Sequence, residues 1–144
     1  MTLSSPLNTQ QLELESITTL ESQLQQRQNL AAIGQRYTDI AWAAGLFEGE
    51  GCITTDHRSK NCRIIQMKMT DLDVMERYVD VVGYGNLNGP YKDSKNTQFK
   101  PWWQWNVYKG SEVLRILKMF LPHFGKRRAE KAIEAINHLH ETIM

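Results

Sequence analysis

Hydrophobic and polar residues alternate along parts of this chain in the manner of half-buried β-strands. Ile65, Met67 and Met69 are separated by polar residues, and residues 103–108 show the same two-residue period. Because successive side chains of a strand point to opposite faces, each stretch predicts a strand with one apolar and one polar face. Shorter runs rich in β-branched or aromatic residues complete the set. The expected strands span residues 52–55, 63–70, 84–88 and 103–108.

Between these strands, apolar residues recur every three or four positions, which is the spacing of amphipathic helices. Asp71 is a favoured N-cap and Gly83 a favoured C-cap for one of these helices. Ser111 should begin the next helix and Pro122 should end it. Gly89 should open a long polar loop after the third strand. The expected helices include residues 72–82, 112–121 and 127–143. A central helix from about residue 40 should end at the Gly-x-Gly run of residues 49–51, which we expect cannot continue as helix.

The expected elements follow the order α-β-β-α-β-β-α-α. This order predicts an α+β domain over residues 37–144, in which four antiparallel strands form one sheet and the helices cover one of its faces. The other face would be polar and exposed. Its expected residues are Gln66, Lys68, Gln104 and Asn106.

Residues 1–36 differ in composition from the rest of the chain, because Gln and Leu are unusually frequent in them. Their leucine and isoleucine side chains are spaced loosely, like one face of a helix. We expect a helical or partly disordered N-terminal extension. The alternative is an added helix that packs on the domain or contacts a partner. No catalytic chemistry is visible in this segment.

Length and composition fit one soluble globular domain, with 144 residues of which 41% are hydrophobic and 23% charged. No apolar run approaches the ~18 residues that span a bilayer, and no signal peptide opens the chain. A soluble intracellular protein of the cytoplasm or an organelle is therefore expected. Cys52 and Cys62 are too few and too far apart for a zinc site, so we expect free thiols that are cross-strand neighbours.

The net charge of +1 is small for a protein that binds nucleic acid. The distribution of charge is more informative than its sum. Residues 57–70 contain four cationic side chains and no acidic one, which predicts a local basic surface. These four residues are Arg58, Lys60, Arg63 and Lys68.

The central helix carries a stripe of small residues, since Ala41, Gly45 and Gly49 recur every four positions. Such a stripe lets two helix backbones approach closely, so it predicts a helix–helix interface. Glu48 and Glu50 stand at the C-terminal end of this helix, where the helix dipole is negative. If two such helices pair, their carboxylates meet, and a divalent metal ion is the natural counter-charge.

Residues 43–51, with the sequence Ala-Ala-Gly-Leu-Phe-Glu-Gly-Glu-Gly, resemble the nine-residue signature of the LAGLIDADG homing endonucleases. Ala43 stands where the signature has Leu, and Glu48 and Glu50 stand where it has Asp. Each Glu keeps the charge but is one methylene longer. The element order from about Tyr37 to His138 also matches the αββαββα core of the family, in which the open face of the sheet binds DNA.

One copy of the signature implies a homodimer. Its two subunits would present two equivalent base-recognition surfaces to near-palindromic double-stranded DNA. The implied dimer interface consists of Ala41, Gly45, Glu48 and Gly49. By the same resemblance, Glu50 would bind a catalytic Mg²⁺ or Mn²⁺ ion and the Gly49 carbonyl would be a second ligand. Glu48 would be structural, near the base of the helix pair.

Two further catalytic residues are implied by the resemblance. Asp71 would order the catalytic water, and the alternative is that it serves only as a helix cap. Lys126 would lie near the cleaved phosphate, with Arg127 as a rival for the position. The alternative is that Lys126, Arg127 and Arg128 form only a solvated or phosphate-binding helix start.

The polar face of the expected sheet suits the DNA major groove, because Gln and Asn can pair with adenine and Lys or Arg with guanine. Gln66 and Lys68 would contact base edges, and Arg58 or Lys60 would contact phosphates. The alternative for each residue is simple solvation of the outer face. The expected DNA contacts are Arg58, Lys60, Arg63, Gln66, Lys68, Asn88, Gln104, Asn106 and Arg127.

These features predict a metal-dependent homing endonuclease, associated with an intron or intein, that makes a double-strand break in a long DNA site. A non-cleaving nucleic-acid binder on the same scaffold, such as an intron maturase or a transcription regulator, is the main alternative. A plain dimerisation module is disfavoured by the basic and amide-rich strands. Neither a membrane nor a small-molecule substrate is expected as a partner.

Overall fold

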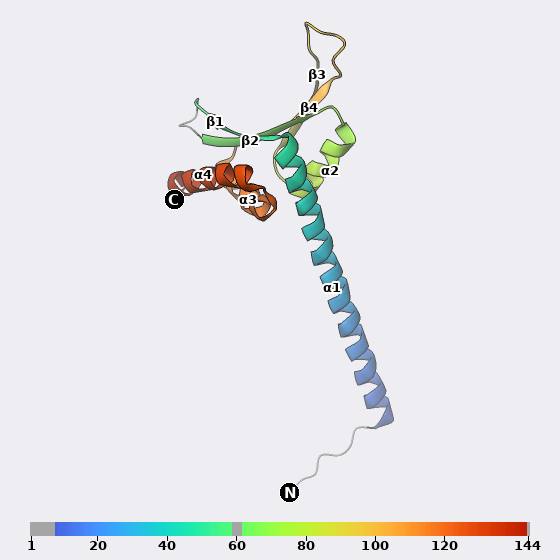
Figure 1. Cartoon of the computed structure of the whole chain (residues 1–144). Helices are drawn as coiled ribbons and strands as arrows, with labels where there is room; N and C mark the ends of the chain where they lie inside the picture. The colour runs from blue at the N-terminus through green and yellow to red at the C-terminus, as the bar shows by residue number, and fades with distance from the viewer. Residues whose placement is uncertain (1–7, 59–61, 144) are drawn as a thin grey trace. The chain divides into compact units, whose positions relative to one another are not determined.

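The computed structural model describes residues 8–58 and 62–143, and Figure 1 shows its helices and strands. The expected order of elements is confirmed, with a short 3₁₀ helix added before the last helix. The elements are α1 (Thr9–Glu50), β1 (Gly51–Asp56), β2 (Cys62–Met69), α2 (Leu72–Val82), β3 (Asn86–Tyr91), β4 (Trp102–Val107), α3 (Gly110–Phe120), η1 (Leu121–His123) and α4 (Lys126–Ile143).

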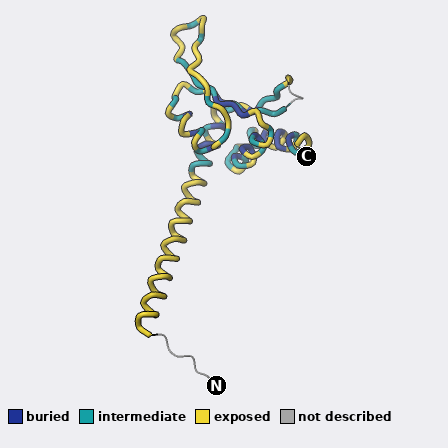
Figure 2. Tube along the Cα trace, turned by 180° about the vertical axis from the view of Figure 1, so that it is seen from behind, coloured by how far each residue is buried: buried dark blue, intermediate teal, exposed yellow. Residues whose placement is uncertain are grey.

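The chain divides into two compact units, residues 1–37 and residues 38–144. In the first unit, the residues from Thr9 onward form the N-terminal part of α1. They are exposed and form the long yellow run of the tube in Figure 2. The expectation of a helical extension is confirmed for this part of the chain. Among the described residues, no helix has the length and apolar character that a membrane span requires.

The second unit is an α+β domain with a four-stranded antiparallel sheet of order β1-β2-β4-β3. α3 and α4 contact β2, and α2 contacts β4. Figure 1 shows α3 and α4 together beneath the β1–β2 hairpin. Five strand residues on the covered face are apolar and at most 2% exposed, which confirms the expected apolar inward face. They are Ile53, Ile65, Met67, Trp105 and Val107.

Aromatic rings join the helices to the covered face of the sheet. The ring of Phe47 in α1 lies 6.4 Å from Trp105 in β4 and 5.8 Å from Phe120 in α3. Tyr78 of α2 meets Trp105 edge-on at 4.8 Å. Edge-to-face and tilted pairs at these distances are favourable. The C-terminal end of α1 is therefore fixed in the core of the second unit.

α1 passes directly into β1 without a connecting loop, because Glu50 ends the helix and Gly51 begins the strand. A Cβ atom at Gly51 would overlap the ring of Phe47, so this position requires glycine. The helix continues through Gly49 to Glu50, so the expectation that it could not enter the Gly-x-Gly run is wrong. Among the glycines that the structure describes, positive φ angles occur only at Gly83, Gly85 and Gly89. The glycines at 49 and 51 therefore serve close packing and exposure of the backbone; neither supplies a left-handed turn.

The third strand differs most from its sequence-based prediction. β3 continues through Gly89 and Pro90 to Tyr91, with an irregularity after Asn88, so the loop expected at Gly89 begins later. β3 is an edge strand, where proline is tolerated because one side of the strand needs no ladder hydrogen bond. A Cβ at Gly89 would lie 2.8 Å from Trp103 Cδ1, so this glycine allows the two strands to approach.

Two smaller expectations are also wrong. α3 begins at Gly110 with Lys109 as N-cap, since the N–H groups of Glu112 and Val113 donate to the Lys109 carbonyl; Ser111 is not the cap. Cys52 pairs in register with Gln66, and Cys62 pairs with Asp56, so the two thiols are not cross-strand neighbours.

Candidate nucleic-acid interface and active site

The open face of the sheet carries polar side chains in two rows that cross three strands. Gln66 of β2 lies opposite Asn106 of β4, which lies opposite Asn86 of β3. In the next row, Lys68 lies opposite Gln104, which lies opposite Asn88. Asn86 was not expected from the sequence as a site residue. It stands two residues before Asn88 on the same strand, so the two side chains point to the same face of the sheet.

The amides of this face bind one another. Gln104 Nε2 donates to Asn106 Oδ1 at 2.8 Å and lies 3.4 Å from Gln66 Oε1. Asn106 is only 5% exposed, whereas Lys68 and Asn88 are exposed. Because each amide takes its orientation from its neighbour, the donors and acceptors that remain free point in defined directions, as base recognition requires. Three predicted DNA-contact residues, Gln66, Gln104 and Asn106, thus form one connected group.

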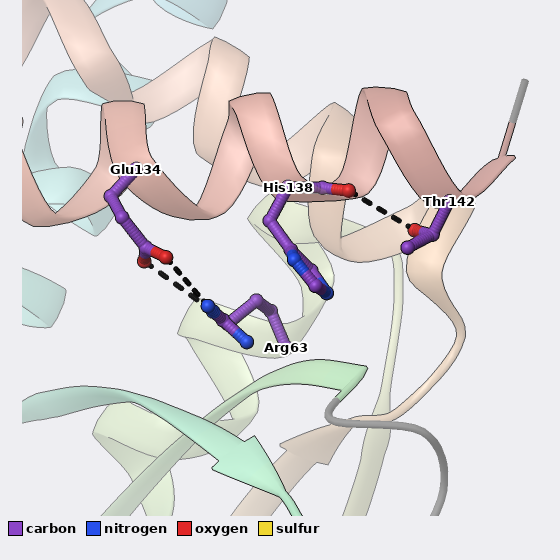
Figure 3. A network of polar contacts seen from close by, with 4 residues as sticks. All are labelled: Arg63, Glu134, His138 and Thr142. Carbon is purple, nitrogen blue, oxygen red and sulfur yellow. Dashed lines mark hydrogen bonds and ion pairs between the residues drawn. The ribbon is translucent and has the colours of Figure 1, made fainter.

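Arg63 does not share this face. Arg63 lies an even number of residues from Ile65 and Met67 on β2, so its side chain points to the same face as theirs. Its guanidinium donates hydrogen bonds to the carboxylate of Glu134 in α4, as Figure 3 shows. The Arg63 side chain is 15% exposed. The hydrogen bond from Arg63 holds the pKa of Glu134 below its ordinary value. Arg63 therefore stabilises the contact between the sheet and α4 and is not directed to the amide-lined side.

The β1–β2 connection carries two further predicted contacts. The Arg58 side chain is 90% exposed, and its Nε lies 3.4 Å from Asp56 Oδ1. Asp56 Oδ1 also accepts the backbone N–H of Arg58 at 3.0 Å, which fixes the start of the turn. Lys60 lies outside the described residues.

Glu50 and Asp71 line one shallow depression of about 350 Å³ at one end of the open face. Lys68, Met69, Thr70 and Trp102 complete its lining. Asp71 occupies the N-cap position of α2, but its carboxylate makes no capping hydrogen bond. Two of the three predicted catalytic residues are therefore brought together, beside a predicted DNA-contact lysine. The Asp71 carboxylate is not used by the helix it precedes.

The third predicted catalytic residue, Lys126, is exposed at the first turn of α4 and does not line this depression. The start of α4 nevertheless adjoins the end of α1, because Glu48 Oε1 accepts the N–H of Gly125 at 2.5 Å. Arg127 is exposed beside Lys126. Glu48 is half-buried in this contact within one chain, which agrees with a structural role for its carboxylate.

The stripe of small residues lies on the side of α1 away from the core. Ala43, Ala44 and Phe47 are fully buried, whereas Gly45 and Gly49 are exposed. A Cβ atom built on either glycine would meet nothing within 4 Å. The helix therefore presents bare backbone there that nothing in the second unit covers.

The donors near the depression suit a hard divalent cation. Glu50 and Asp71 offer carboxylate oxygens, and the Gly49 carbonyl is next to Glu50 in the chain. Within residues 8–58 and 62–143, no cluster of three or more His, Cys, Asp or Glu side chains could hold a metal ion. Mg²⁺ is commonly bound by one or two carboxylates together with substrate phosphates. The residues present fit that mode, in which nucleic acid completes the ligand set.

No protein-family model matches the sequence, and no curated protein matches it. Solved structures do match, and several of them are homing endonucleases. I-CvuI in complex with the I-CreI target in the presence of Mg aligns with a TM-score of 0.59 and 14% identity, over 74% of this chain and 68% of that chain. The archaeal intron-encoded homing endonuclease I-Vdi141I, complexed with DNA, gives 0.55 and 10% over 72% and 68%. I-TnaI gives 0.54 and 15% over 69% and 70%. The second unit thus has the fold of the homing endonucleases.

Proposed function

We propose that the protein is a site-specific DNA endonuclease that acts as a homodimer on near-palindromic double-stranded DNA inside the cell. The observation that carries this proposal is the depression in which Glu50 and Asp71 meet Lys68 at one end of an amide-lined open face. This arrangement supports the proposal, because the carboxylates would serve metal-assisted hydrolysis and the neighbouring polar side chains would serve base recognition. A homing role, with the gene in an intron or intein, belongs to the same proposal.

The open face would enter the major groove, with Gln66, Lys68, Gln104 and Asn106 at base edges. Asn86 and Asn88 would extend this contact along the edge strand. Arg58 and Lys60 would contact phosphates, as would Arg127 at the start of α4. The amide network supports this assignment, since side chains that are already oriented lose little entropy on binding.

At the scissile phosphate, Glu50 and the Gly49 carbonyl would hold Mg²⁺ or Mn²⁺, which supplies neutralisation of developing charge and a water of lowered pKa. Asp71, whose carboxylate is free of the helix cap, would orient that water. Lys126 would stand beside the phosphate from the first turn of α4. In-line hydrolysis needs this positioning and electrostatic stabilisation more than covalent chemistry by the protein.

A second copy of the chain would pack on the stripe of Ala41, Gly45 and Gly49, which is open in one protomer. The two depressions would then come together near the paired helix ends. Each protomer would read one half-site and contribute one Glu50, so that both DNA strands are cut.

Incubation with a randomised duplex library, with and without Mg²⁺, tests the proposal. Metal-dependent nicking or double-strand cleavage at a recurrent site is expected, and a Glu50→Gln protein prepared in parallel controls for contaminating nuclease. Selective binding without cleavage would instead identify a non-cleaving nucleic-acid binder, a function that the amide-lined face alone would also serve. Absence of both binding and cleavage would refute the proposal.

A further inference from the structure

Two hydrogen bonds join the end of α1 to the beginning of α4, and Glu48 accepts both of them, one with its side chain and one with its backbone carbonyl. The Glu48 carboxylate accepts the N–H of Gly125, and Arg128 Nη2 donates to the Glu48 backbone carbonyl at 3.0 Å. Arg128 Cζ also lies 5.5 Å from the ring centroid of Phe47. Each helix end therefore receives a partner from the other helix. Gly125 is closely fitted here, since a Cβ on it would lie 2.8 Å from Glu48 Oε1.

Arg128 differs from the two basic residues that precede it. Lys126 and Arg127 are exposed, whereas Arg128 is half-buried against the last turn of α1. The sequence Lys-Arg-Arg therefore places its third member in contact with the protein, while the first two are directed to solvent. Arg128 was interpreted from the sequence only as part of a basic helix start.

The C-terminal end of α1 would be stabilised by a nearby positive charge. Its last carbonyl groups have no partners within the helix, and the helix dipole makes this end negative. Glu48 and Glu50 add two carboxylates at the same end, and no basic residue lies in the last turn of α1. Arg128 supplies from α4 both the positive charge and the hydrogen-bond donor that α1 itself lacks.

We propose that Arg128 is a positioning residue that fixes the last turn of α1 and thereby the placement of the Gly49 carbonyl and the Glu50 carboxylate. This inference rests on the proposed endonuclease function. Glu50 is two residues beyond the carbonyl that Arg128 holds, so a displacement of that carbonyl is transmitted to it. Displacements of about 1 Å at a catalytic group can reduce rates 10²-fold.

Arg128→Gln and Arg128→Lys are the test variants. Lys118→Gln, which removes one exposed positive charge from α3, is the matched control. Three quantities are measured on the full chain: the single-turnover cleavage rate at saturating protein with Mg²⁺, the Kd for DNA in Ca²⁺, and hydrogen exchange of the amides in residues 48–53. Near-ultraviolet circular dichroism verifies that each variant is folded.

For Arg128→Gln we expect cleavage roughly 10- to 100-fold slower, a Kd changed far less than the rate, and faster exchange in residues 48–53. Arg128→Lys should recover part of the rate, because it restores the charge but not the fixed geometry of the guanidinium. A rate equal to that of Lys118→Gln, or a loss that only follows the loss of DNA affinity, would overturn the proposal.

The hydrogen exchange separates this inference from the proposed function. If the parent protein cleaves no duplex, the endonuclease proposal fails, but exchange still reports on the end of α1. Unchanged exchange in Arg128→Gln would then overturn the positioning role. Faster exchange confined to residues 48–53 would support it.

Discussion

Arg63 of β2 and Glu134 of α4 form an ion pair on the helix-covered side of the sheet, with Arg63 Nη2 2.5 Å from Glu134 Oε1. The hydrogen bond from Arg63 lowers the pKa of Glu134 from its ordinary value of 4.5. Because the folded-state pKa is depressed, the pair stabilises the fold above the ordinary pKa, and this stabilisation is lost as the pH falls through the folded-state value.

Glu134→Gln should therefore reduce the free energy of unfolding at neutral pH by up to about 1 kcal/mol, the range for partly exposed pairs. The difference from the parent protein should shrink as the pH falls below 4.5. Urea unfolding across this pH range measures it. Glu130→Gln, at an exposed position of the same helix, is the control. A deficit for Glu134→Gln that persists undiminished in acid would exclude the ion pair as its source.

Glu50→Gln should abolish most cleavage, because it removes the charge from the proposed metal site while it nearly preserves size. A loss of roughly 10²–10³-fold or more is expected. DNA binding in metal-free buffer should be retained or tightened, since a negative charge facing the phosphates is gone. Single-turnover cleavage and DNA titration measure the two effects.

Glu48→Gln is the matched comparison, because the amide oxygen can still accept the N–H of Gly125. Its cleavage should fall much less than that of Glu50→Gln. The reverse ranking would show that the metal-binding carboxylate has been misassigned.

Gly45→Leu should prevent dimer formation. A Cβ atom at this position would meet nothing within 4 Å in the protomer, so we expect the fold of the second unit to be unaffected while a second helix could no longer approach. Sedimentation velocity should show a monomer, and circular dichroism an unchanged fold. Gly45→Ala adds one methyl group and should weaken the dimer less. A Gly45→Leu protein that sediments as the parent dimer would place the interface elsewhere.

Lys68→Ala should relax base preference at one position of each half-site, with a loss of ~1–3 kcal/mol of discrimination. Selection from a DNA library in Ca²⁺ gives the preference profile. Arg58→Ala should instead weaken binding to all sequences and reduce the salt slope by about one. Lys118→Ala, on α3, should do neither. Identical profiles for Lys68→Ala and the parent would contradict the assignment.

The element order and the polar face were predictable because they depend on periodicity, which is local in sequence. The same alternation places Arg63 with Ile65 on the covered face, yet its charge suggested a DNA contact. Charge alone does not reveal a partner on a helix that follows seventy residues later. Strict application of the two-residue period of a strand would have placed Arg63 on the opposite face from Gln66 and Lys68.

Other features depend on contacts that no local pattern contains. The extension of β3 to Tyr91 reflects its place at the edge of the sheet, which sequence order does not give. The association of Glu50 with Asp71 and that of Glu48 with Arg128 arise only when β1, β2 and α4 pack together. The nine-residue signature singled out Glu48 and Glu50, but not Arg128, whose guanidinium donates to the Glu48 backbone carbonyl.

If the protein acts as proposed, the absence of a loop between Glu50 and Gly51 would have a consequence for the length of its DNA site. Because helix and strand are continuous, a rotation of α1 at a dimer interface would tilt the amide-lined sheet with it. The separation of the two base-reading surfaces would then be set by the crossing angle of two helices, with no flexible segment to adjust it. In the proposed dimer, the number of base pairs between the half-sites would follow from that angle. A variant such as Gly45→Ala, which alters helix approach without abolishing it, is therefore expected to change the preferred spacing of the target.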